Sequence, residues 1–294
     1  MAKEEPVSSV PETSLANLIN QYDYFLIDQF GVLRDDEGAY EGAAAALQRL
    51  KENGKRVIVL SNSGRSGDYN AERFVRLGFE RGLFERFVTS GDVAFDILSR
   101  SEDIRRGMRA FTISSGDDQN LADRLDLTTV PRSNDADLVI ISGSEAERIA
   151  LDVYRRMLEP AAANHTPCIC TNPDIHKLAG GKNAPGAGAI ARIYEELGGK
   201  VQWIGKPYHQ IYSHAMSVWG SLDRAKVVCI GDSIEHDIKG AANVGLASVL
   251  VRTGILASKS DKELFALMKS CEAVPTYLMH EFAPAGRCRQ PGGR

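Results

Sequence analysis

The chain alternates short apolar runs with longer stretches in which apolar residues recur at helical spacing. The runs at residues 24–27 and 57–60 are continuous and rich in branched and aromatic types, as in strands buried on both faces of a parallel sheet. Residues 42–54 are rich in Ala and Leu, and Gly54 ends them as a helix cap does. A strand, a helix and a parallel strand form a βαβ unit. The pattern therefore predicts an α/β fold with a parallel sheet.

The same rhythm divides the chain into three parts. Residues 94–177 contain their own apolar runs, and from residue 178 the first rhythm returns. We interpret the middle part as a separate small α/β lobe inserted into the first sheet. Pro160 should shorten the helix expected over residues 146–163, because proline disrupts helical hydrogen bonding. The strands predicted for the second and third parts are residues 109–113, 138–141, 168–171, 201–204, 227–230 and 247–251.

Composition and charge are those of an ordinary soluble globular protein. The 294 residues carry a net charge of −4 at pH 7, which argues against a broad nucleic-acid surface. No apolar run approaches the roughly 20 residues of a membrane span, and residues 1–14 lack the apolar core of a signal peptide. The five scattered cysteines suit reduced thiols. We expect a cytoplasmic protein with no nucleic-acid or membrane partner, and flexible termini at residues 1–14 and 285–294.

Polar residues follow directly on several of the predicted strands. The carboxyl ends of parallel strands meet at one edge of the sheet, where ligands collect in open α/β folds. Carboxylates gathered there repel each other unless a cation lies between them, and oxygen ligands shared with a phosphate suit Mg²⁺. A lysine and a hydroxyl can hold phosphate oxygens, and an aspartate can accept a phosphoryl group. The residues at these strand ends are Asp28, Ser61, Asn62, Lys206, Asp232 and Asp237.

In sequence order, these residues resemble the four-motif series of the haloacid dehalogenase superfamily. The motifs are Asp28-x-x-Gly31-Val32, Leu60-Ser61-Asn62, Gly205-Lys206-Pro207 and Gly231-Asp232 with Asp237. Over residues 22–278 the chain is similar to subclass IIA, in which a large α/β cap lies between the second and third motifs. That subclass contains nucleotide, phosphoglycolate and pyridoxal phosphate phosphatases. The resemblance implies a Rossmann-like core over residues 15–93 and 178–284, with the cap inserted over residues 94–177.

The resemblance also implies how the chain would bind metal. Asp28 would be the nucleophile that attacks phosphorus. Its carboxylate, the backbone carbonyl of Phe30 and the carboxylate of Asp232 would bind Mg²⁺. Asp237 would support this site from outside the direct contacts of the ion. A Mg²⁺ cofactor is therefore expected.

Substrate binding is implied in the same way. Ser61 and Lys206 would bind the phosphoryl oxygens, and Lys206 would also reduce the negative charge on Asp28. Asn62 would hold the phosphoryl group or the adjoining loop. The cap would close over a small phosphorylated substrate, exclude water and set specificity. Capped relatives often dimerise through the cap, so a homodimer stays open.

Phe30 departs from the family pattern. Phosphatases of the family carry a second aspartate two residues after the nucleophile, which acts as general acid and base, and phenylalanine cannot move a proton. General acid–base catalysis is typically worth about 10²–10⁴-fold, so turnover should fall unless another group replaces the aspartate. His236, beside Asp237, is a candidate replacement, although a solvated loop histidine is the other interpretation. Asp174 and His176 face substrate or belong to a turn.

Three hypotheses follow for the function. The first is a Mg²⁺-dependent phosphatase that acts on a small phosphorylated metabolite through an aspartyl-phosphate on Asp28. The second is an impaired relative that binds a phosphometabolite or stalls at the aspartyl-phosphate, which Phe30 favours. The third is a dehalogenase-like aspartyl-ester hydrolase, since dehalogenases also have an aromatic residue at this position. They lack the metal carboxylates, whereas Asp232 and Asp237 are present here.

Overall fold

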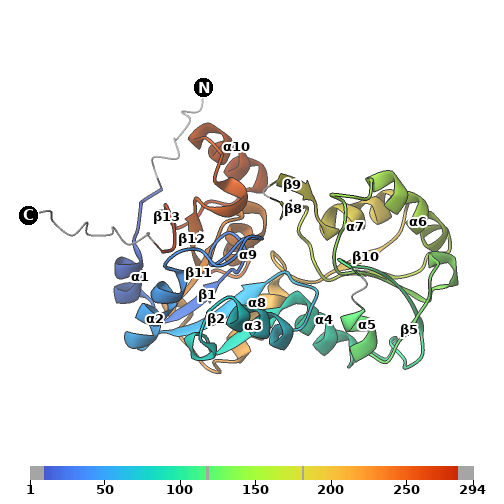
Figure 1. Ribbon diagram of the computed structural model, residues 1–294, viewed down its shortest axis with the longest axis horizontal. Helices are drawn as coiled ribbons and strands as arrows, with labels where there is room; N and C mark the ends of the chain where they lie inside the picture. Colours follow the sequence, from blue (N-terminus) through green and yellow to red (C-terminus); the bar gives the residue numbers. More distant parts are fainter. Residues whose placement is uncertain (1–9, 117–118, 181, 284–294) are drawn as a thin grey trace, which may run out of the picture.

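The computed structural model describes residues 10–116, 119–180 and 182–283. Two sheets lie side by side with helices packed around them, so that the molecule has two lobes (Figure 1). In the order β13-β12-β11-β1-β2-β3, neighbouring strands of the first sheet all run parallel. Its strands are β1 (Tyr24–Ile27), β2 (Arg56–Ser61), β3 (Arg86–Thr89), β11 (Val227–Gly231), β12 (Ala247–Val251) and β13 (Tyr277–Met279).

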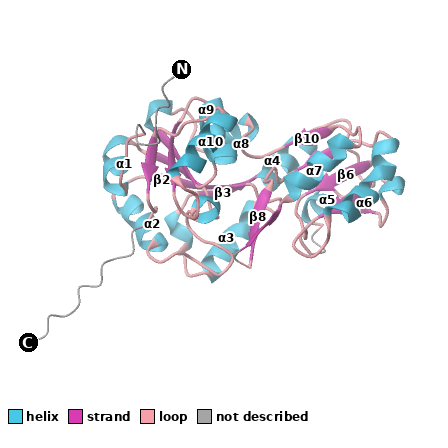
Figure 2. Ribbon diagram, turned by 90° about the horizontal axis from the view of Figure 1, so that it is seen from above, coloured by secondary structure: helices cyan, strands magenta, loops and turns pink. Residues whose placement is uncertain are grey.

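The second sheet is also parallel and has the order β10-β7-β6-β4-β5. An antiparallel hairpin of β8 and β9 lies between the lobes (Figure 2). The prediction of an α/β protein with a Rossmann-like parallel core and an inserted α/β lobe is confirmed. These strands are β4 (Arg109–Ile113), β5 (Thr128–Thr129), β6 (Leu138–Ile141), β7 (Cys168–Cys170), β8 (His176–Ala179), β9 (Lys182–Pro185) and β10 (Val201–Trp203).

Helices cover both faces of the first sheet, as its continuous apolar strands predict. In β1, Phe25 and Ile27 pack with α1, α2 and α3, while Leu26 packs with α4 and α8 on the other face. Side chains alternate between the faces of a strand, so a strand covered on both sides is apolar throughout. No described helix is long and apolar enough to cross a membrane. The helices are α1 (Leu15–Gln21), α2 (Ala43–Glu52), α3 (Gly67–Arg76), α4 (Ser90–Leu98), α5 (Asn120–Arg124), α6 (Leu151–Ala163), α7 (Ala187–Glu196), α8 (His209–Ser217), α9 (Lys239–Asn243) and α10 (Asp261–Cys271).

One apolar layer continues from the first sheet into the second. Val93 and Leu98 of α4 pack in a cluster that contains Leu26 of the first sheet and Ile140 of the second. All four side chains are at most 3% exposed. Burial of an aliphatic side chain of this size stabilises the fold by roughly 1.5–3 kcal/mol. The layer shared through α4 therefore holds the two lobes together.

The second sheet extends further along the sequence than expected. Val201–Trp203, which the motif pattern assigned to the core, pairs with β7 instead, with Val201 opposite Cys168. Helix α7 also belongs to the second lobe, because Ile190 and Tyr194 pack in the core of that lobe. A short apolar run predicts a strand but does not show which sheet the strand joins. The chain returns to the first lobe only after β10.

Pro160 does not shorten its helix as predicted. Helix α6 continues past it and ends at Ala163. Ala161 and Ala162 are buried in the core of the second lobe, and this burial outweighs the missing amide donor of proline.

The expectation of a flexible N-terminal segment is wrong for residues 10–14. Val10 is buried, the Leu278 amide donates to the Pro11 carbonyl, and the Thr13 amide donates to the Leu278 carbonyl. These hydrogen bonds attach the segment to the edge strand β13, whose outer backbone groups need partners. Residues 1–9 and 285–294 lie outside the described part of the chain.

Replacement of Phe74 by alanine should strongly destabilise the protein. Phe74 is fully buried on α3, and its ring stacks on Phe79 with the centroids 4.4 Å apart. The cavity left by Phe→Ala typically costs about 3–5 kcal/mol. Urea denaturation followed by circular dichroism should show a much lower midpoint. The neighbouring Val75→Ala, at a position 46% exposed, is the control and should change stability by at most about 0.5 kcal/mol. Equal midpoints for the two variants would contradict this packing.

Candidate active site

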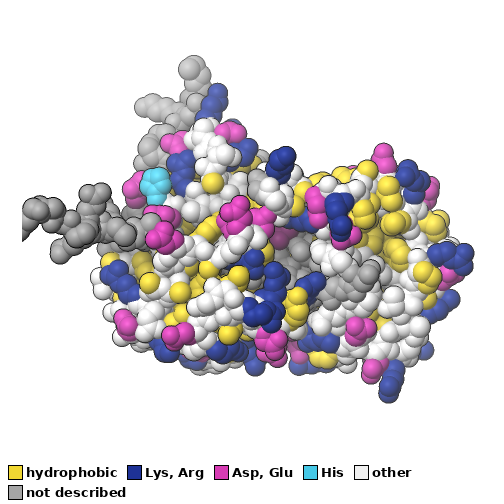
Figure 3. Space-filling model, in the orientation of Figure 1, with side chains coloured by type: hydrophobic (Ala, Val, Ile, Leu, Met, Phe, Trp, Pro, Cys, Tyr) yellow, Lys and Arg dark blue, Asp and Glu magenta, His cyan; other side chains and the backbone are white. Residues whose placement is uncertain are grey.

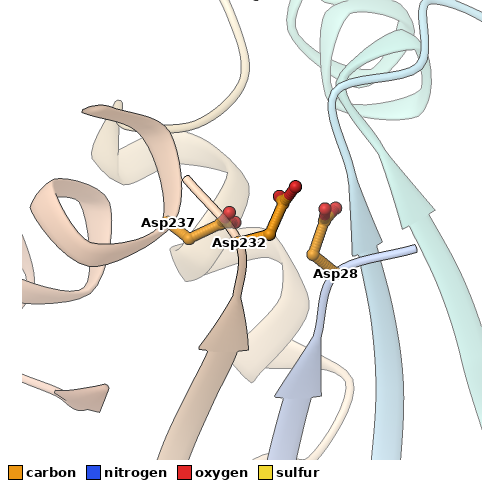
Figure 4. A group of neighbouring side chains, drawn as sticks. All are labelled: Asp28, Asp232 and Asp237. Atoms are coloured by element: carbon orange, nitrogen blue, oxygen red, sulfur yellow. The ribbon is translucent and has the colours of Figure 1, made fainter. Parts of the chain in front are cut away.

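Three buried carboxylates meet at the carboxyl edge of the first sheet. β1 and β11 are neighbours with Ile27 opposite Ile230, so the residues that follow them leave the sheet side by side. Asp28 and Asp232 point to the same side, and Asp237 reaches towards them from the next turn (Figure 4). Oxygens of the three carboxylates lie within 4.8 Å of one another. The structure thus brings together the acidic residues that the sequence predicts at these strand ends.

A short π-helix, Ile234–Ile238, positions Asp237. The hydroxyl of Ser233 accepts a hydrogen bond from the His236 amide (3.2 Å), and the Ser233 amide donates to Asp237 Oδ2 (3.1 Å). A Cβ at Gly231 would lie 2.1 Å from Asp237 Cγ. The glycine at the end of β11 therefore leaves the space that this carboxylate occupies.

Two further glycines make room for Asp232. A Cβ at Gly31 would lie 2.0 Å from Asp232 Oδ2, and one at Gly254 would lie 1.9 Å from the same atom. Both glycines have positive φ, which other residues rarely adopt. The Ile255 amide donates to Asp232 Oδ2 (2.9 Å) and fixes the carboxylate in this space.

Lys206 bridges two of the carboxylates. Its Nζ donates to Asp28 Oδ1 (2.6 Å) and to Asp237 Oδ1 (2.7 Å), and the residue is 3% exposed. Burial alone would lower the pKa of Lys206, but the charges of Asp237 and Asp28 outweigh it and raise this pKa. The lysine therefore stays protonated within the cluster.

The cluster has more negative charge than Lys206 can balance. Burial raises the pKa of Asp28 to about 7, with Lys206 opposing the shift and Asp237 adding to it. Burial, followed by the charges of Asp28 and Asp237, raises the pKa of Asp232 well above its ordinary value. The raised pKa values mean that Asp28 and Asp232 resist ionisation in this cluster without a further cation. Fully ionised, three carboxylates and one lysine would leave two negative charges, which a divalent cation would compensate. The donor set thus fits such an ion. Among the described residues, no backbone amide donates a hydrogen bond to the Phe30 carbonyl, and Phe30 lines the adjoining cavity.

Ser61 is oriented by a neighbour that the sequence reasoning missed. Gln29 is buried, and its Nε2 donates to Ser61 Oγ (3.1 Å). The Ser63 amide donates to the same oxygen (3.2 Å). Since both of these bonds are accepted by Oγ, the hydroxyl proton of Ser61 is left to be donated. Only the position of Gln29 directly after Asp28 hinted at such a role.

Asn62 links loops from both lobes. Its Nδ2 donates to Asp174 Oδ1 (2.8 Å) and to the Lys206 carbonyl (3.1 Å), and its Oδ1 accepts from the Lys206 amide (2.6 Å). These bonds hold the adjoining loop, which is one of the two roles expected of Asn62, and phosphoryl binding by Asn62 stays a prediction.

A cavity of about 260 Å³ opens above the carboxylates. Core residues line one side, and His176, Lys177 and Leu178 of the hairpin line another. Asp174 also lines it and lies 3.6 Å from His236 Nε2. His236 is 8% exposed and Nδ1 has no partner among the residues that the structure describes, so the solvated-loop interpretation is wrong.

Comparison with known proteins agrees with these features. Residues 25–128 match the family model described as haloacid dehalogenase-like hydrolase, and residues 203–282 match a HAD-hydrolase-like model. A crystal structure of a haloacid dehalogenase-like hydrolase from Brucella suis is 30% identical with a TM-score of 0.80, and the alignment covers 93% of this chain and 100% of that chain. The chain belongs to the haloacid dehalogenase-like hydrolases. The predicted membership of this superfamily, and of its subclass IIA with the large cap, is therefore confirmed.

Other relatives of this hydrolase cover nearly the whole chain. Chronophin of Mus musculus is 27% identical over 288 residues, which span 92% of this chain and 94% of chronophin. The structure of the p-nitrophenyl phosphatase from Archaeoglobus fulgidus is 26% identical with a TM-score of 0.68, and the alignment covers 89% of this chain and 97% of that one. Both lobes are therefore shared with these relatives.

Replacement of Gly31 by alanine should abolish divalent-cation binding. The added methyl group would occupy the position of Asp232 Oδ2 and displace that carboxylate. Thermal unfolding should show a rise in Tm with divalent cation for the unmodified protein and none for Gly31→Ala. Gly78→Ala is the matched control, because Gly78 also has positive φ (94°) but a Cβ there meets nothing within 4 Å. Retention of the Tm rise by Gly31→Ala would contradict this account.

Proposed function

We propose that this hydrolase is a Mg²⁺-dependent phosphatase that acts on a small phosphoester through an aspartyl-phosphate on Asp28. The observation that carries the proposal is the placement of Asp28. It lies at the base of the cavity, bonded to Lys206 and beside Asp232. The p-nitrophenyl phosphatase among the relatives supports the same class of reaction.

Each polar group then has a task in the first half of the reaction. A carboxylate oxygen of Asp28 bonds to phosphorus as the bond from phosphorus to the leaving oxygen breaks. Lys206 opposes the effect of burial on the pKa of Asp28 and so favours its ionised form, and Ser61 donates its free hydroxyl proton to a phosphoryl oxygen. Asp28, Asp232 and the Phe30 carbonyl would hold Mg²⁺, which would supply positive charge near the phosphoryl oxygens. Water then attacks phosphorus and releases phosphate from Asp28.

The proton for the leaving oxygen needs another source than Phe30. The phenyl ring is 38% exposed, lines the cavity and has no titratable group. Asp174 and His236, which lie 3.6 Å apart in the cavity wall, are the groups that we propose face the substrate and handle this proton. Good leaving groups need less protonation and should be the better substrates.

A second candidate function rests on Phe30 alone. Without an efficient acid and base, the protein would bind a phosphorylated metabolite or stop at the aspartyl-phosphate.

A dehalogenase is less favoured, because Asp232 and Asp237 are buried together with Asp28. Cytoplasmic location and a homodimer stay predictions.

Phosphate release from a panel of small phosphoesters, including 4-nitrophenyl phosphate, tests the proposal. Release should require Mg²⁺, stop with chelator and fall to the assay background in Asp28→Asn, because the nucleophile is lost. Asp23→Asn is the matched control, since Asp23 precedes the opposite end of β1 and its side chain is 53% exposed. Release by Asp28→Asn would refute the covalent mechanism. A folded, Mg²⁺-binding protein that releases no phosphate would favour the second candidate.

Replacement of Phe30 by aspartate should accelerate hydrolysis of esters with poor leaving groups. The gain in kcat expected for an alkyl phosphate is at most about 10²–10⁴-fold, the usual worth of general acid–base catalysis, and it is smaller to the extent that Asp174 and His236 already transfer the proton. The gain for 4-nitrophenyl phosphate should be smaller, because its leaving group departs without a proton. Phe30→Asn is the control of similar shape without a titratable proton. If both variants hydrolyse the alkyl phosphate equally fast, position 30 does not limit proton transfer.

A further inference from the structure

A guanidinium without a partner faces the cavity from α3. Arg73 lines the cavity that holds Asp28, and it is half-buried. Its side chain has no hydrogen bond or ion pair within residues 10–116, 119–180 and 182–283. The mechanism proposed above gives Arg73 no task. A cation held at the wall of a binding cavity without a counter-ion is a site for an anion.

The geometry of α3 directs Arg73 inwards. Asn70 lies one helical turn earlier and also lines the cavity, where its Nδ2 donates to Ser63 Oγ (3.1 Å). Residues three apart lie on one helix face, so Asn70 and Arg73 share the face that borders the cavity. Phe74 packs into the core, while Arg76 is exposed.

A second guanidinium strengthens the positive charge at this wall. Arg34 is only 4% exposed and lies over the Phe30 ring, with Cζ 4.6 Å from the ring centroid. Its Nε donates to the Asp35 carbonyl (2.7 Å), and it forms no ion pair within the part of the chain that the structure describes. Burial, and then the charge of Arg73, lower the pKa of Arg34, while the charges of Asp35 and Asp36 oppose this shift.

The other cations that line the cavity are already paired. Lys206 is bonded to Asp28 and Asp237, and Lys177 Nζ lies 2.6 Å from Glu147 Oε2. Lys and Arg side chains gather in the region of α3 on the face of the molecule seen in Figure 3. Among the described Lys and Arg side chains that line the cavity, Arg73 is therefore the one without a counter-ion.

We propose that the substrate carries a second anionic group, a carboxylate or a second phosphate, and that Arg73 binds it. This inference rests on the proposed function, because it assumes that the first phosphate sits at Asp28. A guanidinium can bind either anion through two parallel hydrogen bonds. Arg34 adds positive charge behind Phe30, whose ring would contact the carbon chain between the two anionic groups. Arg73 thus determines specificity and takes no part in the transfer itself.

A matched set of esters shows whether Arg73 prefers a carboxylate or a second phosphate. Each series has one alkyl chain of three to five carbons with phosphate at one end and a methyl, a carboxylate or a second phosphate at the other. With Mg²⁺ present, kcat/KM for the better anionic series should exceed that for the methyl series by about 10–100-fold, the worth of one charged hydrogen-bonded contact. The better series identifies the group as carboxylate or phosphate.

Substitution of Arg73 tests the assignment. In Arg73→Gln the ratio of kcat/KM between anionic and methyl esters should fall to about one, and in Arg73→Lys it should be intermediate because the charge remains without the guanidinium plane. Arg76→Gln, on the exposed face of the same helix, should keep the full ratio. Circular dichroism and Tm must match among the three variants. An unmodified protein without preference, or Arg73→Gln with its preference intact, overturns the proposal.

A measurement of ester binding distinguishes failure of the Arg73 proposal from failure of the proposed phosphatase function. If no ester releases phosphate, the phosphatase proposal fails, but titration calorimetry of the same esters with the Mg²⁺-loaded protein still measures the preference. Tighter binding of the anionic esters that is lost in Arg73→Gln would support the Arg73 site even then. Equal affinities in both proteins would overturn it.

Discussion

The site depends on the need to balance three buried carboxylates. Lys206 supplies the one positive charge within the cluster and joins Asp28 to Asp237 through two short hydrogen bonds. Removal of one partner of a buried ion pair typically costs about 3–5 kcal/mol, because the remaining charges stay buried without compensation. The positions of the strand ends, the glycines beside Asp232 and the π-helix that carries Asp237 all serve this arrangement of charge.

Lys206 also joins the two lobes at the point where chemistry is expected. It follows β10 of the second sheet and reaches Asp28, which follows β1 of the first. Asn62, after β2, holds the backbone of Lys206 and the side chain of Asp174, which lies beyond β7. The nucleophile and the cavity wall contributed by the second lobe are thus held in one hydrogen-bonded network. Such support around a reactive group keeps it in its working orientation.

Sequence reasoning placed Asp28, Ser61, Lys206 and Asp232 together because parallel strands must end at a common edge. Sequence reasoning failed where contacts between distant parts of the chain determine which sheet a strand joins or which side chain is buried. The apolar run of β10 fits either sheet, and only its pairing with β7 assigns it to the second. His236 lies in a polar stretch that is typical of a solvated loop, yet it is buried in the wall of the cavity. Gln29 carries no motif of its own, and its bond to Ser61 joins residues 32 positions apart.

The apolar layer that runs through α4 has a consequence for the size of the ligand. A cap on a flexible hinge could swing away and admit a phosphorylated side chain on the surface of another protein. Here Val93 and Leu98 belong to one buried cluster with residues of both sheets, so a wide opening would expose core residues to water. If the lobes stay together, entry through the mouth of a cavity of about 260 Å³ would favour a small phosphorylated metabolite, as the proposed function requires. The fold itself would then exclude macromolecular phosphoesters before any side chain in the pocket recognises them.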